Sequence, residues 1–342
     1  MTPGVEVLFV GTADGFEGRL APRHGYRLVT VPASPYARTG ARGKVRAVTA
    51  TASGVLAARR MLRREGIELV LGLGGYASLP TVVAAWTLRL PTALHEANAV
   101  AGRANRLAGR LVDTVLLAFE TARAGFAPTG ALTGVPVREE IVRLGAVPRP
   151  PRGDGPRRVL VLGGSGGSPF LDARAPVLLG RLVARGQPVT ARHQVGDGDV
   201  AATRAAYAAA GVSADVVPYV DDMAAAYAWA DFVVTSAGAV TLAELAVVGL
   251  PALVVPLARA AFDHQTANAS AFAALTEVPW VKEDAFAPDA LADVVAPVLG
   301  SEVAWRAASE RIRRAARADA ADAVVRRCLA LVNGADGGSR AP

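Results

Sequence analysis

Residues 157–169 read RRVLVLGGSGGSP, an apolar run, a turn with four glycines, and a serine before a proline. The apolar run predicts a buried strand, because the strands of parallel sheets are covered on both faces. Ser168 suits the N-cap of a following helix, and Pro169 suits its first position. Glycines let backbone N–H groups approach a phosphate, the helix N-terminus adds positive potential, and Ser165 can donate a further hydrogen bond. The stretch therefore predicts a strand, turn and helix that can hold a phosphate, with an ordinary tight turn as the alternative.

Strand-like runs alternate with Ala-rich helical stretches on both sides of this unit. The expected strands before it are 5–11, 27–31, 68–72, 91–96 and 113–119. The expected strands after it are 188–194, 214–220, 231–236 and 251–257. Such alternation predicts parallel sheets with helices on both faces, in which ligands bind at the carboxyl ends of the strands.

Proline and glycine cluster in VPRPPRGDGP, at 147–156, which is typical of a linker. The length of 342 residues also suits two domains better than one. We therefore expect an α/β fold of two Rossmann-like, doubly wound parallel-sheet domains that face a cleft. The expected boundaries are 1–140 for the first domain, 141–156 for the linker, 157–318 for the second domain, and 319–342 for a C-terminal helix and tail with the option of packing back on the first domain.

The composition excludes several classes of protein. The chain has one cysteine, Cys328, so neither a disulfide framework nor a cysteine-based zinc site is expected. Residues 69–88 carry no charge, but three glycines and Pro80 within them favour a strand, a turn and a helix over a membrane span. The first residues lack the pattern of a signal peptide. The sequence therefore predicts a soluble cytoplasmic protein.

The basic residues are distributed unevenly. The net charge is +7, but residues 1–150 hold 19 Lys and Arg against 10 Asp and Glu, giving +9, while the remainder holds 18 against 20, giving −2. Eleven basic residues and no acidic one lie between Arg19 and Arg64. A basic half suggests an anionic partner such as nucleic acid, a lipid surface or a phosphate. Coding bias toward arginine is the alternative source of the excess.

Further stretches place small or polar side chains at predicted strand ends and helix starts. TSAGAVTLAE (235–244) is a second strand-to-helix turn, in which the carboxylate of Glu244 can accept a ribose diol or simply be solvated. GGYASLP (74–80) repeats the glycine turn, HEANAVAGRANR (95–106) follows a strand end, and DHQTANA (263–269) precedes a helix. No set of His, Cys and carboxylates has metal-ligand spacing, so no metal is expected.

Together with TGVPVR (133–138) and YVDDMAAAYAWAD (219–231), these stretches occur in the order typical of one family. The sequence resembles the MurG-type glycosyltransferases, which are undecaprenyldiphospho-muramoylpentapeptide N-acetylglucosaminyltransferases. The resemblance implies a GT-B fold and transfer of N-acetylglucosamine from UDP-N-acetylglucosamine to the C4 hydroxyl of lipid I, with inversion, giving lipid II for peptidoglycan and cell-wall synthesis. It also implies peripheral binding to anionic lipid at the cytoplasmic face of the inner membrane, with no cofactor and no nucleic acid partner.

The resemblance implies roles for individual residues. The implied donor-binding residues are Asn98, Arg138, Ser165, Val220, Met223, Ala239, Val240, Thr241, Leu242, Ala243, Glu244, His264 and Gln265. Among them, Ser165 would meet the diphosphate, Glu244 the ribose hydroxyls, and the main chain of Val220 the uracil edge. Arg138 would supply charge for the leaving UDP. The acceptor diphosphate would be held by Gly74, Gly75 and Tyr76.

The sequence departs from the family pattern at several positions. The family's opening strand, its G-G-T-G-G-H loop and its first helix have no counterpart, and the loop histidine suspected as general base is among them. Glu96 is the nearest substitute base, although a carboxylate at a strand end can instead orient its loop. Ser236 stands in place of an arginine, and Gly166 in place of a glutamine. Two other functions stay open, a UDP-N-acetylglucosamine 2-epimerase-like enzyme and a non-catalytic UDP-sugar-binding protein.

Overall fold

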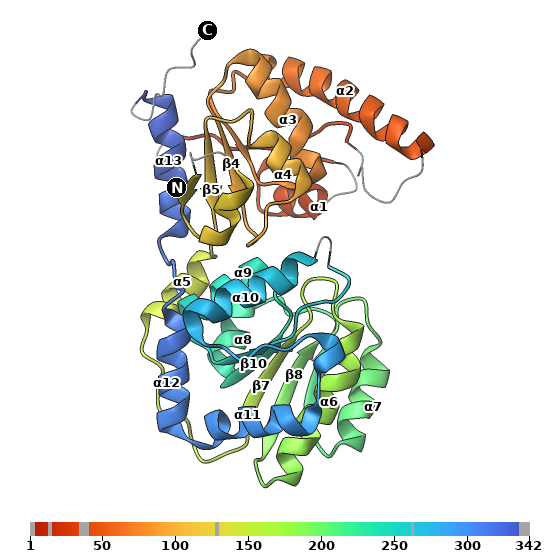
Figure 1. Ribbon diagram of the computed structural model, residues 1–342, viewed down its shortest axis with the longest axis vertical. Coiled ribbons are helices and arrows are strands. Elements are labelled where there is room, and N and C mark those ends of the chain that lie inside the picture. The colour runs from red at the N-terminus through yellow and green to blue at the C-terminus, as the bar shows by residue number, and fades with distance from the viewer. Residues whose placement is uncertain (1–3, 13–15, 34–40, 127–129, 261–262, 335–342) are drawn as a thin grey trace. The chain divides into compact units, whose positions relative to one another are not determined.

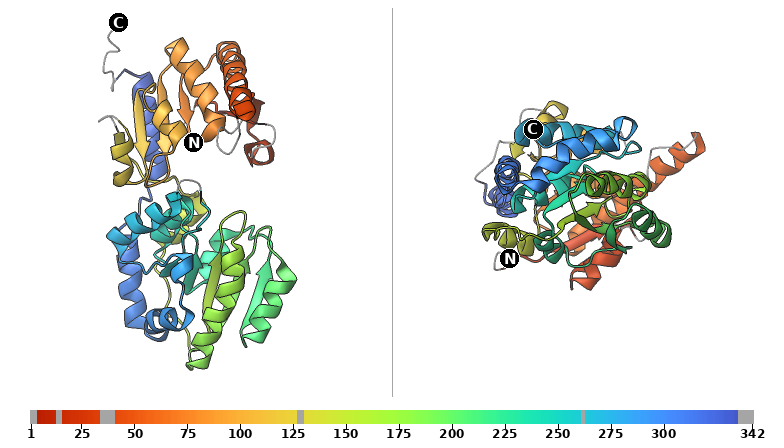
Figure 2. Two further views of the ribbon diagram at one scale, coloured as in Figure 1. Left: turned by 45° about the vertical axis from the view of Figure 1, so that its right-hand side comes forward. Right: turned by 90° about the horizontal axis from the view of Figure 1, so that it is seen from below.

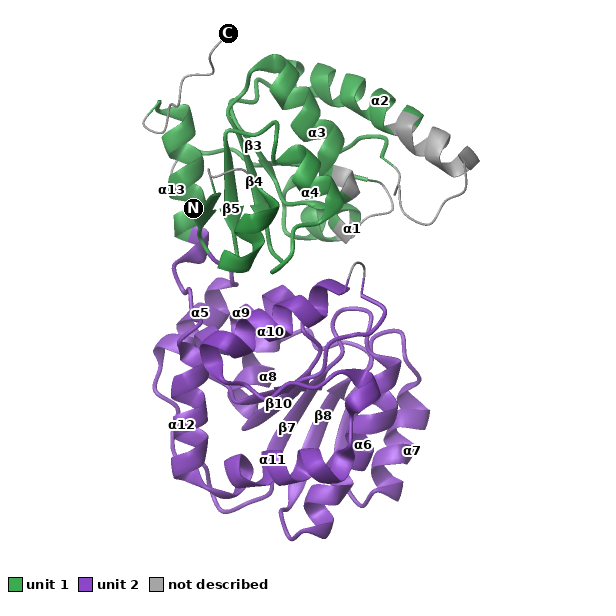
Figure 3. Cartoon of the chain, viewed as in Figure 1, with its two compact units in different colours: residues 1–133, 322–342 green, residues 134–321 purple. Residues whose placement is uncertain are grey.

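The computed structural model describes residues 4–12, 16–33, 41–126, 130–260 and 263–334 (Figure 1). The chain divides into a first unit, Met1–Thr133 with Asp322–Pro342, and a second unit, Gly134–Ala321 (Figure 3). Both units are built on parallel strands that alternate with helices. The expected α/β fold with two parallel-sheet units is therefore confirmed.

The second unit contains a five-stranded parallel sheet in the order β11-β10-β7-β8-β9. Its strands are β7 (Arg157–Leu162), β8 (Val189–Gln194), β9 (Ser213–Val217), β10 (Phe232–Thr235) and β11 (Ala252–Val254). The first strand of this unit, β7, lies in the centre and pairs with both β8 and β10. The chain therefore winds outward in one direction through β8 and β9, then returns to the other side of β7. The point of return lies between β7 and β10.

Helices cover both faces of this sheet (Figure 2). The helices of the second unit are α5 (Glu139–Ala146), α6 (Pro169–Ala184), α7 (Val200–Ala209), α8 (Met223–Trp229), α9 (Ala239–Val248), α10 (His264–Thr276), the short η3 (Glu283–Ala285), α11 (Pro288–Gly300) and α12 (Glu302–Arg313). On the face covered by α6, α7 and α11, the alternating side chains Val159 and Val161 of β7 pack in one core with Leu178, Tyr207 and Val295. The opposite face carries α8, α9 and α12.

The segment expected to be a linker is part of the second unit. Residues 147–156 are irregular, as their prolines and glycines predict, but they are held in place by arginine side chains. The Arg149 guanidinium donates hydrogen bonds to the carbonyl oxygen of Ala230, at 2.7 Å, and to that of Tyr227, and it lies 6.0 Å from the ring centre of Trp305. The division of the chain after Thr133 therefore differs from the expected boundaries at 140 and 156.

The described residues of the first unit form two separate parallel sheets. Strands β3 (Val70–Gly72), β4 (Thr92–Glu96), β5 (Thr114–Leu117) and β6 (Gly130–Leu132) pair in that order, and β1 (Leu8–Gly11) pairs with β2 (Arg27–Thr30). The sequence predicted all of these strands except β6. Strand β6 has only three residues, one of them a glycine, so its sequence contains no apolar run long enough to predict a strand.

The helices of the first unit are α1 (Phe16–Arg23), α2 (Ala41–Arg64), α3 (Gly75–Leu88), α4 (Arg103–Ala108), the short η1 (Glu120–Gly125) and α13 (Ala320–Val332), which enters this unit at Asp322. Val324 and Cys328 of α13 pack with Ala93 of β4 and Leu116 of β5. The C-terminal helix therefore completes one core of the first unit. Among the residues described, no helix combines the length and the apolar character needed to cross a bilayer.

Candidate active site

The strand order of the second unit identifies where a ligand can bind. In doubly wound sheets, ligands occupy the crevice outside the carboxyl ends of the strands where the winding reverses. Here that point lies between β7 and β10, which are followed by the turns 163–168 and 236–238. The two turns are adjacent, since a Cβ atom added to Gly164 would lie 3.6 Å from Oγ of Ser236. The two glycine turns that the sequence identified therefore line one site.

The turn 163–168 has a backbone that requires glycine at two positions. Gly164 and Gly167 have φ angles of 90° and 77°, and a Cβ atom on Gly167 would lie 1.8 Å from the carbonyl oxygen of Val195. Ser168 caps α6 as predicted, because its Oγ accepts a hydrogen bond of 3.2 Å from the backbone N–H of Leu171. Ser165 is exposed at the tip of the turn. This geometry leaves backbone and hydroxyl donors of the turn accessible to an anion.

A buried glutamine that sequence reasoning missed connects the turn to Val220. Nε2 of Gln194 donates to the carbonyl oxygen of Gly164 at 3.0 Å, and its Oε1 accepts from the backbone N–H of Val220 at 2.9 Å. Because that N–H is engaged within the protein, Val220 can offer a nucleotide base its carbonyl oxygen instead. The only sequence signal for Gln194 is a polar residue at the end of a buried strand. Met223, expected beside Val220, begins α8.

The turn 236–238 is held by two buried amide side chains of α10. Oε1 of Gln265 accepts hydrogen bonds from the backbone N–H groups of Ala237, at 2.9 Å, and Leu257, at 3.0 Å. Nδ2 of Asn268 donates to the carbonyl oxygen of Ala237 at 3.1 Å. Gln265 can therefore meet a sugar hydroxyl only through its NH₂ group, while His264 precedes it as the first residue of α10.

Helix α9 begins in this site without a side-chain cap. Its N-cap is Gly238, which makes no capping hydrogen bond through a side chain. The five residues expected beside the nucleotide open this helix and are Ala239, Val240, Thr241, Leu242 and Ala243. Val240 is exposed, whereas Ala239 and Leu242 are buried. The N-terminal N–H groups of a helix are suited to oxygen atoms of a phosphate or ribose.

Glu244 is buried in the second turn of α9 and is hydrogen-bonded through both oxygens. Its side chain is 5% exposed. Oε1 accepts from Nη2 and Nε of Arg138, at 3.0 and 3.3 Å, and Oε2 accepts from the hydroxyl of Tyr227, at 2.9 Å. Burial, together with the negative charge of Glu244, raises the pKa of Tyr227 well above its usual value, so the hydroxyl remains a donor. The sequence identified Arg138 and Glu244, but it gave no role to Tyr227.

The first unit contains a second candidate cluster around Glu96. This carboxylate is 1% exposed and accepts four hydrogen bonds, from the backbone N–H and Nδ2 of Asn98, the backbone N–H of Gly102, and Nδ2 of Asn105. The amide of Asn105 also lies against Gly74, where a Cβ atom would come within 2.8 Å of its Nδ2. The cluster therefore connects the loop after β4 with the glycine turn before α3.

That glycine turn has an unusual backbone. Gly74 and Gly75 have φ angles of 90° and 78°, and Gly74 is the N-cap of α3 without a side-chain capping bond. The side chain of Tyr76, the third residue expected at the acceptor diphosphate, lies outside the described atoms. The turn resembles the one at 163–168 in offering glycine N–H groups at the start of a helix.

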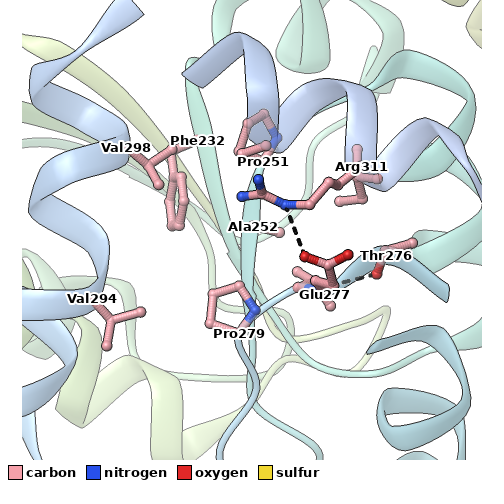
Figure 4. A pocket seen from close by; sticks show the side chains of 12 residues that line it. Phe232, Pro251, Ala252, Thr276, Glu277, Pro279, Val294, Val298 and Arg311 are labelled. Carbon is pink, nitrogen blue, oxygen red and sulfur yellow. Dashed lines mark hydrogen bonds and ion pairs between the residues drawn. The ribbon is translucent and has the colours of Figure 1, made fainter. Parts of the chain in front are cut away.

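A small apolar pocket of about 40 Å³ lies elsewhere on the second unit (Figure 4). Phe232 and Ala252 line it at the amino-terminal ends of β10 and β11, so it is at the sheet edge opposite the two turns. Glu277 and Arg311 form an ion pair of 3.8 Å beside it. The pocket is therefore separate from the candidate active site. Among the described residues, no group of three or more His, Cys, Asp or Glu side chains could hold a metal ion.

Two models of a known enzyme family match the chain. The glycosyltransferase family 28 C-terminal domain matches residues 158–324, and the N-terminal domain of the same family matches residues 1–117. The class defined by this fold and site is therefore that of the two-domain glycosyltransferases.

More specific relatives share most of the sequence. The UDP-N-acetylglucosamine–N-acetylmuramyl-(pentapeptide) pyrophosphoryl-undecaprenol N-acetylglucosamine transferase of Acidithiobacillus ferrooxidans is 40% identical over 337 residues, covering 97% of this chain and 92% of the relative. The enzyme of the same name from Geobacter sulfurreducens is 35% identical over 322 residues, covering 94% of this chain and 88% of the relative. The crystal structure of Acinetobacter baumannii MurG matches with a TM-score of 0.76 and 29% identity, covering 95% of this chain and 91% of the MurG chain. The chain belongs to this MurG family of N-acetylglucosamine transferases.

The alternative enzyme class shares only the fold. A UDP-GlcNAc 2-epimerase from Neisseria meningitidis bound to UDP-GlcNAc matches with a TM-score of 0.64, covering 95% of this chain and 91% of the epimerase, but at 10% identity. The structural match supports a common architecture, but at such low sequence identity it carries no argument about the reaction.

Proposed function

We propose that this protein transfers N-acetylglucosamine from UDP-N-acetylglucosamine to the C4 hydroxyl of lipid I, with inversion, and so makes lipid II for peptidoglycan synthesis. The observation that carries the proposal is the site at the reversal of the second sheet, where the turn 163–168 and the uncapped start of α9 lie together with the buried Glu244. Family membership and 40% identity to a transferase of that name support the same reaction.

The donor would bind to the second unit. Ser165 and the N–H groups of the turn 163–168 would contact the diphosphate, and the carbonyl oxygen of Val220 would contact the uracil. Glu244 would accept the ribose hydroxyls, since a buried carboxylate is a strong acceptor. The NH₂ group of Gln265 would meet the sugar, and Arg138 would stabilise the charge on the leaving UDP.

The acceptor diphosphate would bind to the first unit, at the turn formed by Gly74, Gly75 and Tyr76. We assign Glu96 to orienting this region and Asn98, because its two oxygens already accept four hydrogen bonds within the loop. A general base must reach the proton that it removes. The four donors around Glu96 make the orienting role, which the sequence left open, the better supported of the two.

Peripheral attachment to an anionic membrane surface is the second part of this proposal. The basic stretch between Arg19 and Arg64 lies partly outside the described residues, but Arg60 and Arg63 are exposed near the end of α2. By contrast, Arg27 and Arg64 form ion pairs with Glu65. Binding to vesicles that contain acidic lipid, at low salt, with release at high salt, is the expected result. Equal binding to neutral and acidic vesicles would contradict it.

The donor assignment is tested by isothermal titration with UDP and UDP-N-acetylglucosamine. Glu244→Ala should weaken binding by about 1–3 kcal/mol, which is the scale of lost charge-assisted hydrogen bonds. Glu310→Ala, at a carboxylate of α12 beside Arg313, serves as the control. Unchanged affinity in Glu244→Ala would exclude the ribose role. Donor binding without any transfer to a lipid I analogue would favour the non-catalytic alternative.

A further inference from the structure

The two partners of the Glu244 carboxylate differ in their freedom to move. Tyr227, on α8, is completely buried, and its hydroxyl donates to Oε2. Arg138 bonds to Oε1, but its side chain is 46% exposed and also lies 3.8 Å from Glu140. One partner is therefore fixed in the core, and the other lies at the surface of the second unit.

Helix α8 is held firmly enough to keep that tyrosine in place. Asp222 caps its start by accepting from the backbone N–H of Ala225 at 2.8 Å. At its end, the Arg149 guanidinium donates to the carbonyl oxygens of Tyr227 and Ala230. These bonds fix the backbone of α8, and the core packing around the fully buried Tyr227 side chain fixes its hydroxyl.

Counting acceptor positions shows that Glu244 cannot keep all three of its present hydrogen bonds when a ribose diol binds. A carboxylate offers about four acceptor positions. Arg138 uses two on Oε1, and Tyr227 uses one on Oε2. A ribose diol brings two further donors, which exceeds the one position that is left. Arg138, whose side chain is 46% exposed, can turn toward solvent while the diol replaces its hydrogen bonds, whereas the fully buried Tyr227 cannot leave the core.

We propose that Tyr227 is a positioning residue that holds the Glu244 carboxylate in the orientation that accepts a ribose diol, and that Arg138 is the partner the diol displaces. This inference rests on the proposed function, because it assumes that a uridine nucleotide binds at Glu244. The displaced guanidinium becomes available to the phosphate groups of the same nucleotide. Ribose recognition and charge neutralisation are thereby coupled through one carboxylate.

The first test measures UDP affinity by isothermal titration in a double-mutant cycle. Tyr227→Phe removes one oxygen atom and should raise the Kd for UDP by about tenfold, the effect of one charge-assisted hydrogen bond. In a Glu244→Ala background the same substitution should have no further effect, because the carboxylate that it positions is gone. Tyr207→Phe is the matched control, since that buried hydroxyl of the same unit bonds to His193 Nδ1, at 3.0 Å, and its loss should leave the Kd unchanged.

The outcomes separate this inference from the proposed function. Wild-type protein that does not bind UDP would refute the proposed function. A Tyr227→Phe variant with wild-type affinity, beside a weakened Glu244→Ala variant, would overturn the inference alone. An equal loss from Tyr227→Phe in both backgrounds would also overturn it, because the effect would then be structural.

A second measurement does not depend on the folding of the tyrosine variant. Arg138→Ala should bind uridine, which has no phosphate, at least as tightly as the wild-type protein, because no guanidinium must be displaced. Loss of Arg138 should also reduce the advantage of UDP over uridine. The ratio of UDP affinity to uridine affinity should be several-fold smaller in Arg138→Ala than in the wild-type protein. Uridine affinity that falls several-fold in Arg138→Ala would show that Arg138 supports the ribose site and is not displaced.

Discussion

The buried Glu96 carboxylate allows a base and an orienting residue to be distinguished by one substitution. Glu96→Gln keeps the shape of the side chain but replaces one oxygen with an NH₂ group. Each oxygen of Glu96 accepts two hydrogen bonds, Oε1 from Asn98 and Oε2 from Gly102 and Asn105. Whichever way the new amide is oriented, its NH₂ group therefore faces two donors.

The cost of this change follows from the bonds that it removes. Two charge-assisted hydrogen bonds are lost at about 1.5–3 kcal/mol each, and the remaining two become bonds to a neutral oxygen. We expect the free energy of unfolding of the first unit to fall by about 3–6 kcal/mol. Either the backbone N–H of Asn98, whose acceptor is Oε1, or that of Gly102, whose acceptor is Oε2, should lose its protection from hydrogen exchange, according to which oxygen the NH₂ group replaces.

Chemical denaturation followed by hydrogen exchange of the whole chain is the assay. Glu120→Gln is the control, since this carboxylate of the same unit is 60% exposed and pairs with Arg123 across the surface. That variant should unfold like the wild-type protein. A Glu96→Gln variant with wild-type stability and protection but without sugar transfer would refute the orienting role and identify Glu96 as the base.

The glycine turn, the cap of α6 and the lone cysteine provide three further tests. Gly167→Ala places a methyl group against the Val195 carbonyl oxygen and should weaken UDP binding more than tenfold by titration, while Gly166→Ala, with open space around it, should bind UDP nearly as the wild-type protein does. Ser168→Ala removes the cap of α6 and should lower the free energy of unfolding by about 1 kcal/mol in urea. Burial raises the pKa of Cys328 from 9.0 to about 11, so its thiol should resist alkylation at pH 8 until the chain unfolds. The thiol loses its proton at a lower pH in the unfolded chain than in the folded one. Its contribution to the free energy of unfolding is therefore lost as pH rises from about 9 to about 11, and this pH-dependent decrease should be absent in Cys328→Ala.

The parts of the fold that depend on local pattern were predictable from the sequence. The apolar run of β7, the glycines after it and the capping role of Ser168 are all set by neighbouring residues. The alternation of strands and helices likewise predicted parallel sheets, because two parallel neighbouring strands need a long crossover connection between them, which is usually a helix.

The parts that depend on long side chains were not predictable. The arginines of 147–156 look like linker charges in the sequence, yet Arg149 bonds to the end of α8, about eighty residues away. Gln194 lies at the end of a strand and Tyr227 in a helix, at positions where the sequence pattern predicts core residues. Their hydrogen-bond partners, Gly164 and Glu244, come from distant parts of the sequence that the fold brings together. A sequence pattern reports which face is buried, but it does not report which buried polar group meets which.

Direct measurement of sugar transfer tests the central claim. Purified protein would be incubated with UDP-N-acetylglucosamine and a lipid I analogue, and the products would be separated and identified by mass. We predict one N-acetylglucosamine added to the muramoyl sugar for each UDP released, with little UDP released when the acceptor is omitted. Conversion of the UDP-sugar into its 2-epimer, or UDP-sugar binding with no glycosylated lipid formed, would contradict the account.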